Sequence, residues 1–423
     1  MLLLGFGTMN VFRSLKYRNF KLFFYGQSIS LIGTWMQKTA VAWLVYRLTG
    51  SALLLGVVSF VSLIPSLILA PYAGSIVDRH NRYRILVITQ VVSMLQAGAL
   101  AFMLLFRFYN IPAIIGLSLL QGIVNAFDVT CRQSLMVDMV DDKNDLPNAI
   151  ALNSTMTNLA RIAGPAIAGI VLSVFGEDIC FFGNFISYIP VLTCLFMMKL
   201  NTIVPVRSEK SIWAELQEGF RYVSGDPDLS SMILMLTASS LFVIPFNTLM
   251  PIFAKDIFNG DAKTFSWFES AAGLGSVISA VYLANLKTSK NLVKIMSTAS
   301  LIFGVSVLMV AYAGKLPFAL IFMVFTGIGM MAQTSAINTY IQTHAVPAMR
   351  ARAISYYVMA YQGMIPVGSL MAGWLAGALG PRRAVCIEGI IGVLATALFV
   401  LYKRRQAASG NLPDKTVFGR LSR

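Results

Sequence analysis

Long uncharged apolar runs, separated by short charged loops, most constrain what this chain can fold into. Residues 51–77 contain no charged side chain, and neither do residues 85–106. A run of about 20 such residues can cross a bilayer as a helix, which satisfies its own backbone hydrogen bonds there. Arginines in a short loop favour the cytoplasmic side. The two runs therefore predict two membrane-spanning helices joined by a basic cytoplasmic loop, whose distinctive residues are Gly74, Asp78, Arg79, Arg82 and Arg84.

The composition supports a membrane protein and argues against other classes. Hydrophobic residues make up 57% of the 423 residues and charged residues 12%, against roughly 25% charged residues in a typical soluble domain. A net charge of +15 would suit a nucleic-acid binder, but the charges lie in loops, where membrane topology explains them. The four cysteines lie in apolar runs, so we expect no disulfide framework. No nucleotide P-loop, His-Glu-x2-His or Gly-x-Ser-x-Gly motif occurs, so we predict no enzyme, metal or cofactor.

The apolar runs recur along nearly the whole chain, and we predict an all-α membrane protein with twelve spans. Their approximate ranges are 22–46, 52–77, 85–106, 111–136, 148–175, 179–198, 229–253, 265–283, 292–313, 318–343, 354–379 and 384–402. The expected divisions are a lead-in at 1–21, six-helix bundles at 22–200 and 229–403, a linker at 201–228 and a tail at 404–423. Within the linker, Trp213, Leu216, Phe220 and Val223 recur at helical spacing, which predicts a lateral helix. Whether that helix only links the bundles or also regulates them stays open.

The distribution of positive charge orients the spans. With the N-terminus inside, cytoplasmic segments hold 23 Lys and Arg residues, and external segments hold seven. This bias predicts that both termini lie in the cytoplasm. We expect a multi-pass protein of the bacterial cytoplasmic (inner) membrane.

The two halves repeat. Residues 149–176 align without gaps on residues 353–380, an offset of 204, with six identities that include a clustered Gly-x3-Ala-Gly. A repeat displaced by six spans implies two parallel halves, related by an axis along the membrane normal, with a site between them. Small residues and prolines on spans 5 and 11 permit close helix packing and bending. These residues are Gly164, Pro165, Gly169, Pro366, Gly368 and Gly373.

Several motifs resemble those of a transporter family. The pattern Gly74-x3-Asp78-Arg79-x2-Arg82-x-Arg84 between spans 2 and 3 resembles the loop signature of the major facilitator superfamily. Four further stretches resemble its enterobactin-exporter-like branch, the transmembrane secretion effectors. They lie at 32–37, 43–51, 126–134 and 148–165. Two positions depart from the pattern. Asn81 stands where the loop usually has glycine, and asparagine can also adopt the left-handed turn expected there. Lys38 stands where an apolar or small residue is expected.

Charged residues inside the spans are the candidates for transport chemistry, because burying charge in a membrane is costly. At about 1.5 Å per residue, Asp128 and Arg161 both lie near the midplane, on spans 4 and 5. We expect a shared ion pair in which Arg132, one turn from Asp128, also takes part. Either this network only holds the bundle together, or substrate releases it. Asn158 lies one turn from Arg161 and joins the candidate list.

Three further charged residues lie nearer the outer ends of spans. Lys38, on span 1, either binds an anionic group or reaches outward as a packing residue. Glu269 and Glu388 are candidate proton sites on spans 8 and 12, although their shallow placement favours solvated side chains. In the loop signature, we interpret Asp78, Arg79, Arg82 and Arg84 as a cytoplasmic latch that pairs with the inner end of a helix in the second half.

Together these features predict a monomeric secondary exporter of a small amphipathic or anionic molecule, such as a drug or siderophore. The resemblance implies that it works by alternating access in exchange for protons. Membrane lipids surround it, and nucleic acid is not expected as a partner. One alternative is a transporter of lipid or lysophospholipid. Another is a non-transporting scaffold or sensor, which would have no need of the buried charges.

Overall fold

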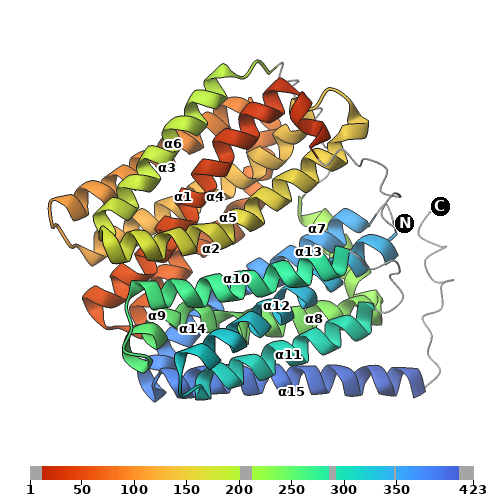
Figure 1. Ribbon diagram of the computed structural model, residues 1–423. Coiled ribbons are helices and arrows are strands. Elements are labelled where there is room, and N and C mark those ends of the chain that lie inside the picture. Colours follow the sequence, from red (N-terminus) through yellow and green to blue (C-terminus); the bar gives the residue numbers. More distant parts are fainter. Residues whose placement is uncertain (1–11, 201–211, 285–291, 347–348, 409–423) are drawn as a thin grey trace, which may run out of the picture. The chain divides into compact units, whose positions relative to one another are not determined.

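The computed structural model describes residues 12–200, 212–284, 292–346 and 349–408, and every regular element within them is helical (Figure 1). The prediction of an all-α fold is therefore confirmed. The described residues form two compact units. The first unit lies within residues 1–44 and 68–208, and the second within 45–67 and 209–423. The first two long helices therefore contribute to both units, because the hairpin 45–67 belongs to the second.

The first six predicted spans each coincide with one long helix. The helices are α1 (Arg18–Thr49), α2 (Ala52–Arg79), α3 (Arg82–Leu105), α4 (Ile111–Leu135), α5 (Leu146–Val174) and α6 (Glu177–Met197). Short 3-10 turns precede α1 (η1, Arg13–Lys16) and follow α4 (η2, Met136–Met139, and η3, Lys143–Asp145). Connections this short force successive helices to run in opposite directions across the unit.

The remaining six spans are also helical, but two of them are interrupted. The elements are α7 (Ile212–Gly225), α8 (Pro227–Phe242), η4 (Ile244–Leu249), α9 (Met250–Ile252), η5 (Phe253–Ile257), α10 (Ala262–Ala284), α11 (Leu292–Tyr312), α12 (Leu316–His344), α13 (Arg350–Gln362), α14 (Met364–Leu379) and α15 (Pro381–Ala408). Span 7 runs from α8 through η5, and span 11 comprises α13 and α14. Among the described residues, nine helical segments are long and apolar enough to cross a membrane.

Prolines explain the interruption of span 7. The α-helix ends at Phe242, and Val243 has φ −114° and ψ −50°. Pro245 has no N–H to donate to the carbonyl of Leu241, so the regular hydrogen-bond ladder stops there. The chain continues as a 3-10 turn and ends in a π-helix, η5. Such departures from α geometry often mark functional segments of a helix.

The sequence repeat has the same local geometry in both units. Gly176 ends span 5 with a φ of 89°, and its equivalent Gly380 ends span 11 with a φ of 88°. A β-carbon at Gly164 would lie 3.0 Å from the Ile32 carbonyl oxygen, on the first span of its unit. At Gly368 it would lie 2.2 Å from the Leu241 carbonyl oxygen, on the first span of the other unit. Each unit therefore has one glycine-dependent crossing between equivalent helices.

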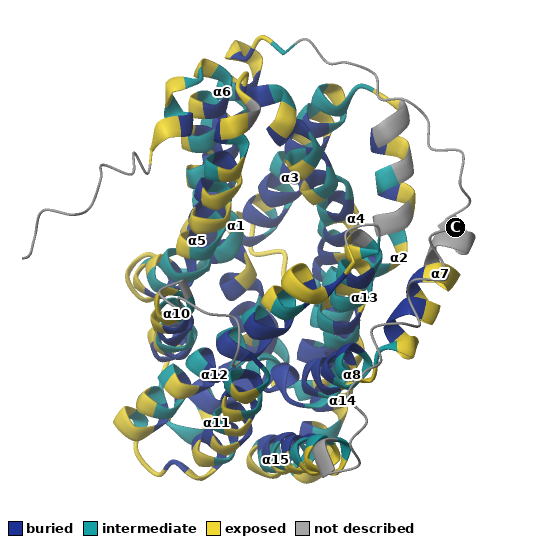
Figure 2. Ribbon diagram, turned by 90° about the vertical axis from the view of Figure 1, so that its right-hand side faces the viewer, coloured by how far each residue is buried: buried dark blue, intermediate teal, exposed yellow. Residues whose placement is uncertain are grey.

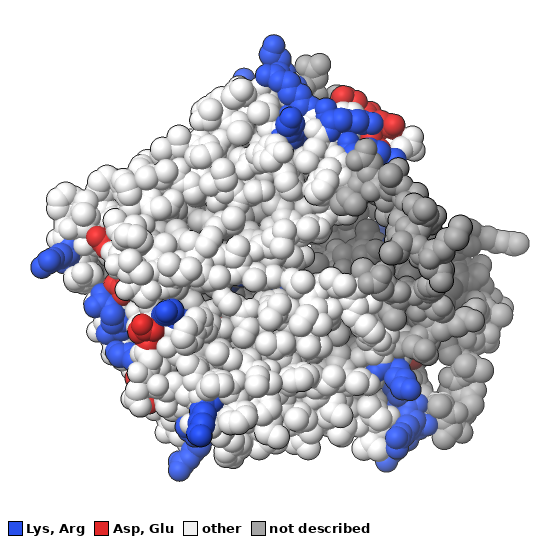
Figure 3. Space-filling model, in the orientation of Figure 1, with Lys and Arg blue, Asp and Glu red and all other residues white. Residues whose placement is uncertain are grey.

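The surface and core follow the expected membrane pattern. Figure 2 shows buried residues on the faces that helices turn toward their neighbours and exposed residues on the outward faces. On the face in Figure 3, charged side chains gather near the ends of helices and leave the middle of the helices uncharged. This uncharged band suits a lipid environment.

The lateral helix α7 lies where the amphipathic pattern predicted it, but its packing face differs. Val223 is buried, whereas Phe220 is 59% exposed and contacts the ring of Tyr356. Phe220 thus lies on the outward side of the helix and packs against an aromatic side chain of α13. The side chains of Trp213 and Leu216 lie outside the described part of the chain.

The 3-10 turn η1 docks on the start of α5. Ser14 is fully buried, and its hydroxyl donates to Asn148 Oδ1 at 2.8 Å and to the Asp145 carbonyl at 3.0 Å. The Asp145 carboxylate pairs with Arg13 and, at 2.7 Å, with Lys16. This basic segment is thus held by a specific acidic partner.

Candidate functional site

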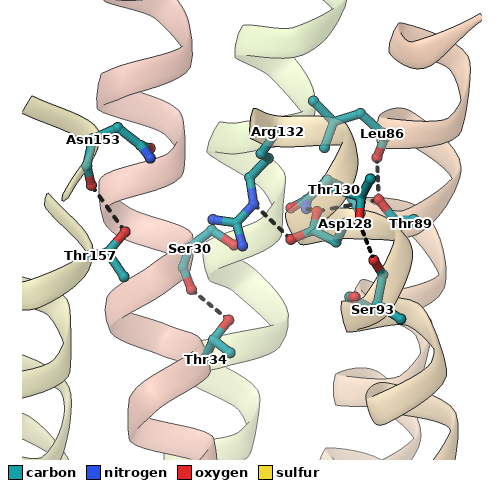
Figure 4. A network of polar contacts seen from close by, with 12 residues as sticks. Ser30, Thr34, Leu86, Thr89, Ser93, Asp128, Thr130, Arg132, Asn153 and Thr157 are labelled. Atoms are coloured by element: carbon teal, nitrogen blue, oxygen red, sulfur yellow. Dashed lines mark hydrogen bonds and ion pairs between the residues drawn. The ribbon is translucent and has the colours of Figure 1, made fainter. Parts of the chain in front are cut away.

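A buried carboxylate organises the polar interior of the first unit. Asp128 on α4 is 7% exposed and faces α3 (Figure 4). Its Oδ1 accepts hydrogen bonds from Gln90 Nε2 at 2.6 Å and from Thr89 Oγ1 at 3.3 Å. Its Oδ2 lies 2.8 Å from Nε of Arg132, one turn further along α4. The carboxylate is therefore saturated with partners, which is what a buried charge requires.

The expected ion pair between Asp128 and Arg161 is not formed, and this expectation is corrected. Arg132 occupies the second oxygen of Asp128 because a residue four positions along the same helix reaches it without any interhelical contact. Arg161 is partly buried on α5, and among the described residues it makes no ion pair or hydrogen bond. Its neighbour Asn158 donates to the Ser154 carbonyl at 2.9 Å, within the same helix. A guanidinium in the interior of span 5 is thus left without a counter-charge from the described part of the chain.

Lys38 lies on α1 beside the crossing of α1 and α5. A β-carbon at Gly164 of α5 would lie 2.4 Å from Cβ of Trp35, so only glycine permits this approach. Lys38 is exposed, and its Nζ lies 4.7 Å from the centroid of the Trp35 ring. The crossing thus brings an indole and a lysine from α1 next to the helix that carries Arg161.

A second polar chain crosses the same unit and was missed from sequence. Gln37 Nε2 donates to Gln96 Oε1 at 3.0 Å, and Asn184 Nδ2 donates to Gln37 Oε1 at 2.8 Å. Gln96 Nε2 in turn donates to the Leu117 carbonyl at 3.2 Å. Uncharged amides do not stand out in a search for charges. Their occurrence within otherwise apolar runs was the available signal.

In the second unit, Glu388 on α15 is buried rather than solvated, which corrects the expectation from its shallow position. It is 5% exposed, and its Oε2 has no hydrogen-bond partner among the described residues. The next residue, Gly389, packs against Leu308 of α11, which explains how packing encloses this turn. Glu269 on α10 is only partly buried.

The hairpin 45–67 is held to the rest of the second unit by a polar contact that sequence reasoning also missed. The Tyr46 hydroxyl, near the end of α1, donates to the Asp256 carboxylate of the π-helix η5. Lys255 Nζ lies 5.4 Å from the centroid of the Tyr46 ring. Gly56 of α2 lies against Gly373 of α14, where a β-carbon on Gly373 would meet Gly56 Cα at 3.1 Å.

The basic loop between α2 and α3 is only partly described. The side chains of Asp78 and Arg79 lie outside the described residues, so the proposed latch is not observed through them. Arg82 lies 4.0 Å from Asp138 Oδ2, within its own unit, and Arg84 is exposed.

The structure also shows the backbone at Asn81 and the space around Gly74 in this loop. Asn81 does not adopt a left-handed turn: its φ is −67°, and its side chain caps α3 by accepting from the Arg84 N–H. The missing glycine is thus replaced by an N-cap, a role that asparagine favours. A β-carbon at Gly74 would meet no atom within 4 Å.

Comparison with known proteins agrees with this architecture. Residues 9–418 match the model of a family described as "Transmembrane secretion effector". The chain is 28% identical to the Staphyloferrin A transporter of Staphylococcus aureus, over 91% of this chain and 96% of that protein. It is 22% identical to Macrolide efflux protein A of Streptococcus pyogenes, over 89% and 95%. A bacterial homologue of the lysosomal transporter Spinster, solved in an inward-facing conformation, shares the fold with a TM-score of 0.74 at 13% identity, over 94% and 99%.

Proposed function

Because this chain belongs to the transmembrane secretion effector family of the major facilitator superfamily, we propose that it exports a small anionic molecule in exchange for protons. It is a multi-pass membrane protein whose relatives are siderophore and drug efflux transporters rather than enzymes. We place it in the bacterial inner membrane with both termini in the cytoplasm, on the basis of the positive charge of the segments assigned there.

The uncompensated charge of Arg161 carries the assignment of an anionic substrate. A charge within a membrane span is costly and requires a partner. Asp128 is already occupied by Arg132, Thr89 and Gln90. The guanidinium of Arg161 is then available for an anionic group of the substrate. A guanidinium suits that role because its planar donors match a carboxylate or phosphate.

Glu388 supports proton exchange in the second unit. An ionised carboxylate that is enclosed without a partner costs several kcal/mol. Such a group can hold a proton while packing encloses it and exchange the proton when water reaches it. Asp128, by contrast, is engaged by three polar side chains of its own unit, namely Arg132, Thr89 and Gln90.

Alternating access would involve the hairpin 45–67. It belongs to the second unit, whereas the rest of α1 and α2 belongs to the first. A rotation between the units must therefore bend these helices near residues 44 and 67, or break the hairpin contacts at Tyr46 and Gly56.

Efflux by an Arg161 variant tests the proposal. Cells that express the wild type or Arg161→Gln are loaded with radiolabelled anionic siderophores, a macrolide or a lysophospholipid, and loss of label is normalised to the amount of protein in the membrane. We expect the wild type to export an anionic siderophore and Arg161→Gln to lose most of that export. Arg383→Gln is the matched control, because Arg383 is exposed at the start of α15. Full export by Arg161→Gln would refute the assignment, and export of lysophospholipid alone would favour a lipid transporter.

A further inference from the structure

We infer that the first unit binds a zwitterionic phospholipid where α3 ends and α6 begins, with the phosphate of the headgroup at Arg107 and its ammonium at Asp178. The class of ligand is a glycerophospholipid whose headgroup ends in a primary ammonium, as in phosphatidylethanolamine. The inference goes beyond the proposed function and does not depend on the exported molecule. With both termini in the cytoplasm, as proposed above, this end of the unit faces the outer leaflet.

A cavity of about 390 Å³ lies between the end of α3 and the start of α6. The two helices pack side by side (Figure 1). The cavity is lined by the last turn of α3, the loop that follows it and the first turn of α6, namely by Leu104, Leu105, Arg107, Tyr109, Glu177 and Asp178. Its volume lies within the roughly 300–1,000 Å³ of typical small-molecule sites. The cavity is therefore large enough for a phospholipid headgroup.

Two opposite charges line this cavity without pairing. The side chains of Arg107 and Asp178 make no ion pair or hydrogen bond, either with each other or with any other part of the chain that the structure describes. Two other lining residues, Tyr109 and Glu177, do take part in interactions within the protein, so we do not assign them to the ligand. A cation and an anion that line one cavity and do not neutralise each other favour a ligand that carries both charges.

The backbone at Arg107 supports a role for its side chain. Arg107 follows the end of α3 with a φ of 56°, a left-handed conformation that favours glycine. Its N–H donates to the Leu104 carbonyl at 2.9 Å. The N–H of Phe108 donates to the Met103 carbonyl at 2.8 Å, which completes a Schellman motif. An arginine is unfavourable for this backbone, and residues held in such conformations cluster at functional sites.

The surface beside the cavity suits acyl chains. Phe102 of α3 and Phe182 of α6 are exposed, and their ring centroids lie 6.4 Å and 6.0 Å from that of Phe185. Phe106 and Phe108, on either side of the arginine in the chain, are exposed as well. Exposed apolar surface of this kind marks contact with a membrane or a partner. A phospholipid would place its headgroup in the cavity and its chains on this surface, which a free zwitterion would leave uncovered.

The two charges also discriminate among phospholipids. The planar guanidinium of Arg107 matches a phosphate, which every phospholipid carries. A primary ammonium can donate charge-assisted hydrogen bonds to the Asp178 carboxylate, whereas the trimethylammonium of phosphatidylcholine has no N–H to donate. Phosphatidylglycerol has no cation and would leave that carboxylate beside a phosphate without a counter-charge. The site should therefore prefer phosphatidylethanolamine.

Lipid binding to the purified full chain tests the inference. Native mass spectrometry of the delipidated protein in detergent would give dissociation constants for phosphatidylethanolamine, phosphatidylcholine and phosphatidylglycerol that carry the same two oleoyl chains. We expect phosphatidylethanolamine to bind roughly tenfold more tightly than the other two. Asp178→Asn should bring the ethanolamine and choline lipids within about twofold of each other, because the variant has no charge to pair with the ammonium.

Arg107→Gly separates binding from folding. This variant should weaken all three lipids, because each loses the partner of its phosphate. Its melting temperature without lipid should be at least that of the wild type, since glycine suits the left-handed backbone. Arg383→Gln is the matched control, because Arg383 is an exposed arginine of the second unit and does not line the cavity. It should keep the wild-type preference among the lipids.

Three results would overturn the inference. The first is equal affinity of the wild type for the three lipids, or a preference for the ethanolamine lipid that survives Asp178→Asn. The second is a lower melting temperature of Arg107→Gly with unchanged lipid affinities, which would make Arg107 a folding residue only. The third is displacement of the lipid by an equal concentration of glycerophosphoethanolamine, because the site would then take a free zwitterion. Efflux by Arg161→Gln tests the proposed function separately, so either conclusion can fail while the other stands.

Discussion

The carboxylate of Asp128 and the guanidinium of Arg132, one turn apart on α4, meet at 2.8 Å. Their side chains are 10% and 12% exposed, so both charges are almost entirely removed from solvent. The pair compensates itself within one helix. This leaves the charge of Arg161, on the neighbouring helix α5, without an anion among the described residues.

Removing Arg132 should destabilise the protein more than removing the whole pair. Breaking a buried ion pair by deleting one partner costs roughly 3–5 kcal/mol, because the other charge stays buried. Arg132→Ala should therefore lower the melting temperature of the protein in detergent. Asp128→Asn combined with Arg132→Gln should recover most of that loss. A double variant less stable than Arg132→Ala would show that the pair does not behave as one unit.

Alanine at either repeated crossing glycine should impair folding. At Gly164 the added carbon would meet Trp35 Cβ at 2.4 Å, and at Gly368 it would meet the Leu241 carbonyl at 2.2 Å. Overpacking of this kind typically costs about 1–3 kcal/mol. We expect less folded protein by fluorescence-detected size-exclusion chromatography for both variants. Gly377→Ala is the control, since a β-carbon there meets nothing within 4 Å. Unchanged yields at positions 164 and 368 would mean that these crossings can open freely.

Glu388→Gln should uncouple export from protons while leaving the fold intact. Glutamine has nearly the same shape and carries no titratable proton, so the packing around α15 should persist. We expect wild-type abundance and melting temperature, together with efflux that no longer responds to an imposed pH gradient. Glu177→Gln, at the start of α6, serves as the control. A wild-type response to the gradient in Glu388→Gln would place the proton site elsewhere.

The docking of η1 should weaken in acid. The pKa of Asp145 is held below its usual value, mainly by the hydrogen bond from Lys16. The hydrogen bond from Tyr17 and the positive charge of Arg13 lower it further. A group whose pKa is depressed by folding contributes stability above its unfolded pKa, about 3.9, and loses it as pH falls through the folded value. The stability difference between the wild type and Asp145→Asn should thus be constant from about pH 5 to 7 and shrink below about pH 4.

Hydrogen exchange of residues 12–20, followed against pH, measures this effect. Asp141→Asn, at an exposed position in the same connection, is the control. A difference between the wild type and Asp145→Asn that grew as the pH fell would contradict the assignment of Asp145 as the anchor.

Tyr46→Phe should loosen the hairpin 45–67 from the rest of the second unit. The change deletes the hydroxyl that donates to Asp256, and a lost hydrogen bond to a charged group costs about 1.5–3 kcal/mol. Backbone amides of residues 45–67 should then exchange faster with deuterium. Tyr282→Phe, at an exposed position on α10, should leave the exchange unchanged. Identical exchange in Tyr46→Phe and the wild type would show that the glycine contacts hold the hairpin alone.

The sequence by itself was sufficient to identify the family, to locate the spans and to detect the repeat of the two halves. Each of the twelve predicted spans coincides with helical structure. The reason is that the thickness of the bilayer sets the length of an apolar run, and its apolar interior requires a helical backbone, so both can be predicted from the local sequence. The repeat offset also led to Gly176 and Gly380, whose left-handed φ values agree within a degree. Candidate charges were found because a charged residue in an apolar run is rare enough to be recognised without a structure.

Only the tertiary structure decided which partner each candidate takes. The choice of Arg132 over Arg161 by Asp128, the enclosure of Glu388 and the attachment of hairpin 45–67 to the second unit depend on side-chain direction and helix crossings. The amide chain through Gln37, Gln96 and Asn184 likewise joins residues up to 147 positions apart. Hydropathy gives the length and depth of a helix but not its rotation, and rotation about the helix axis selects which side chains meet.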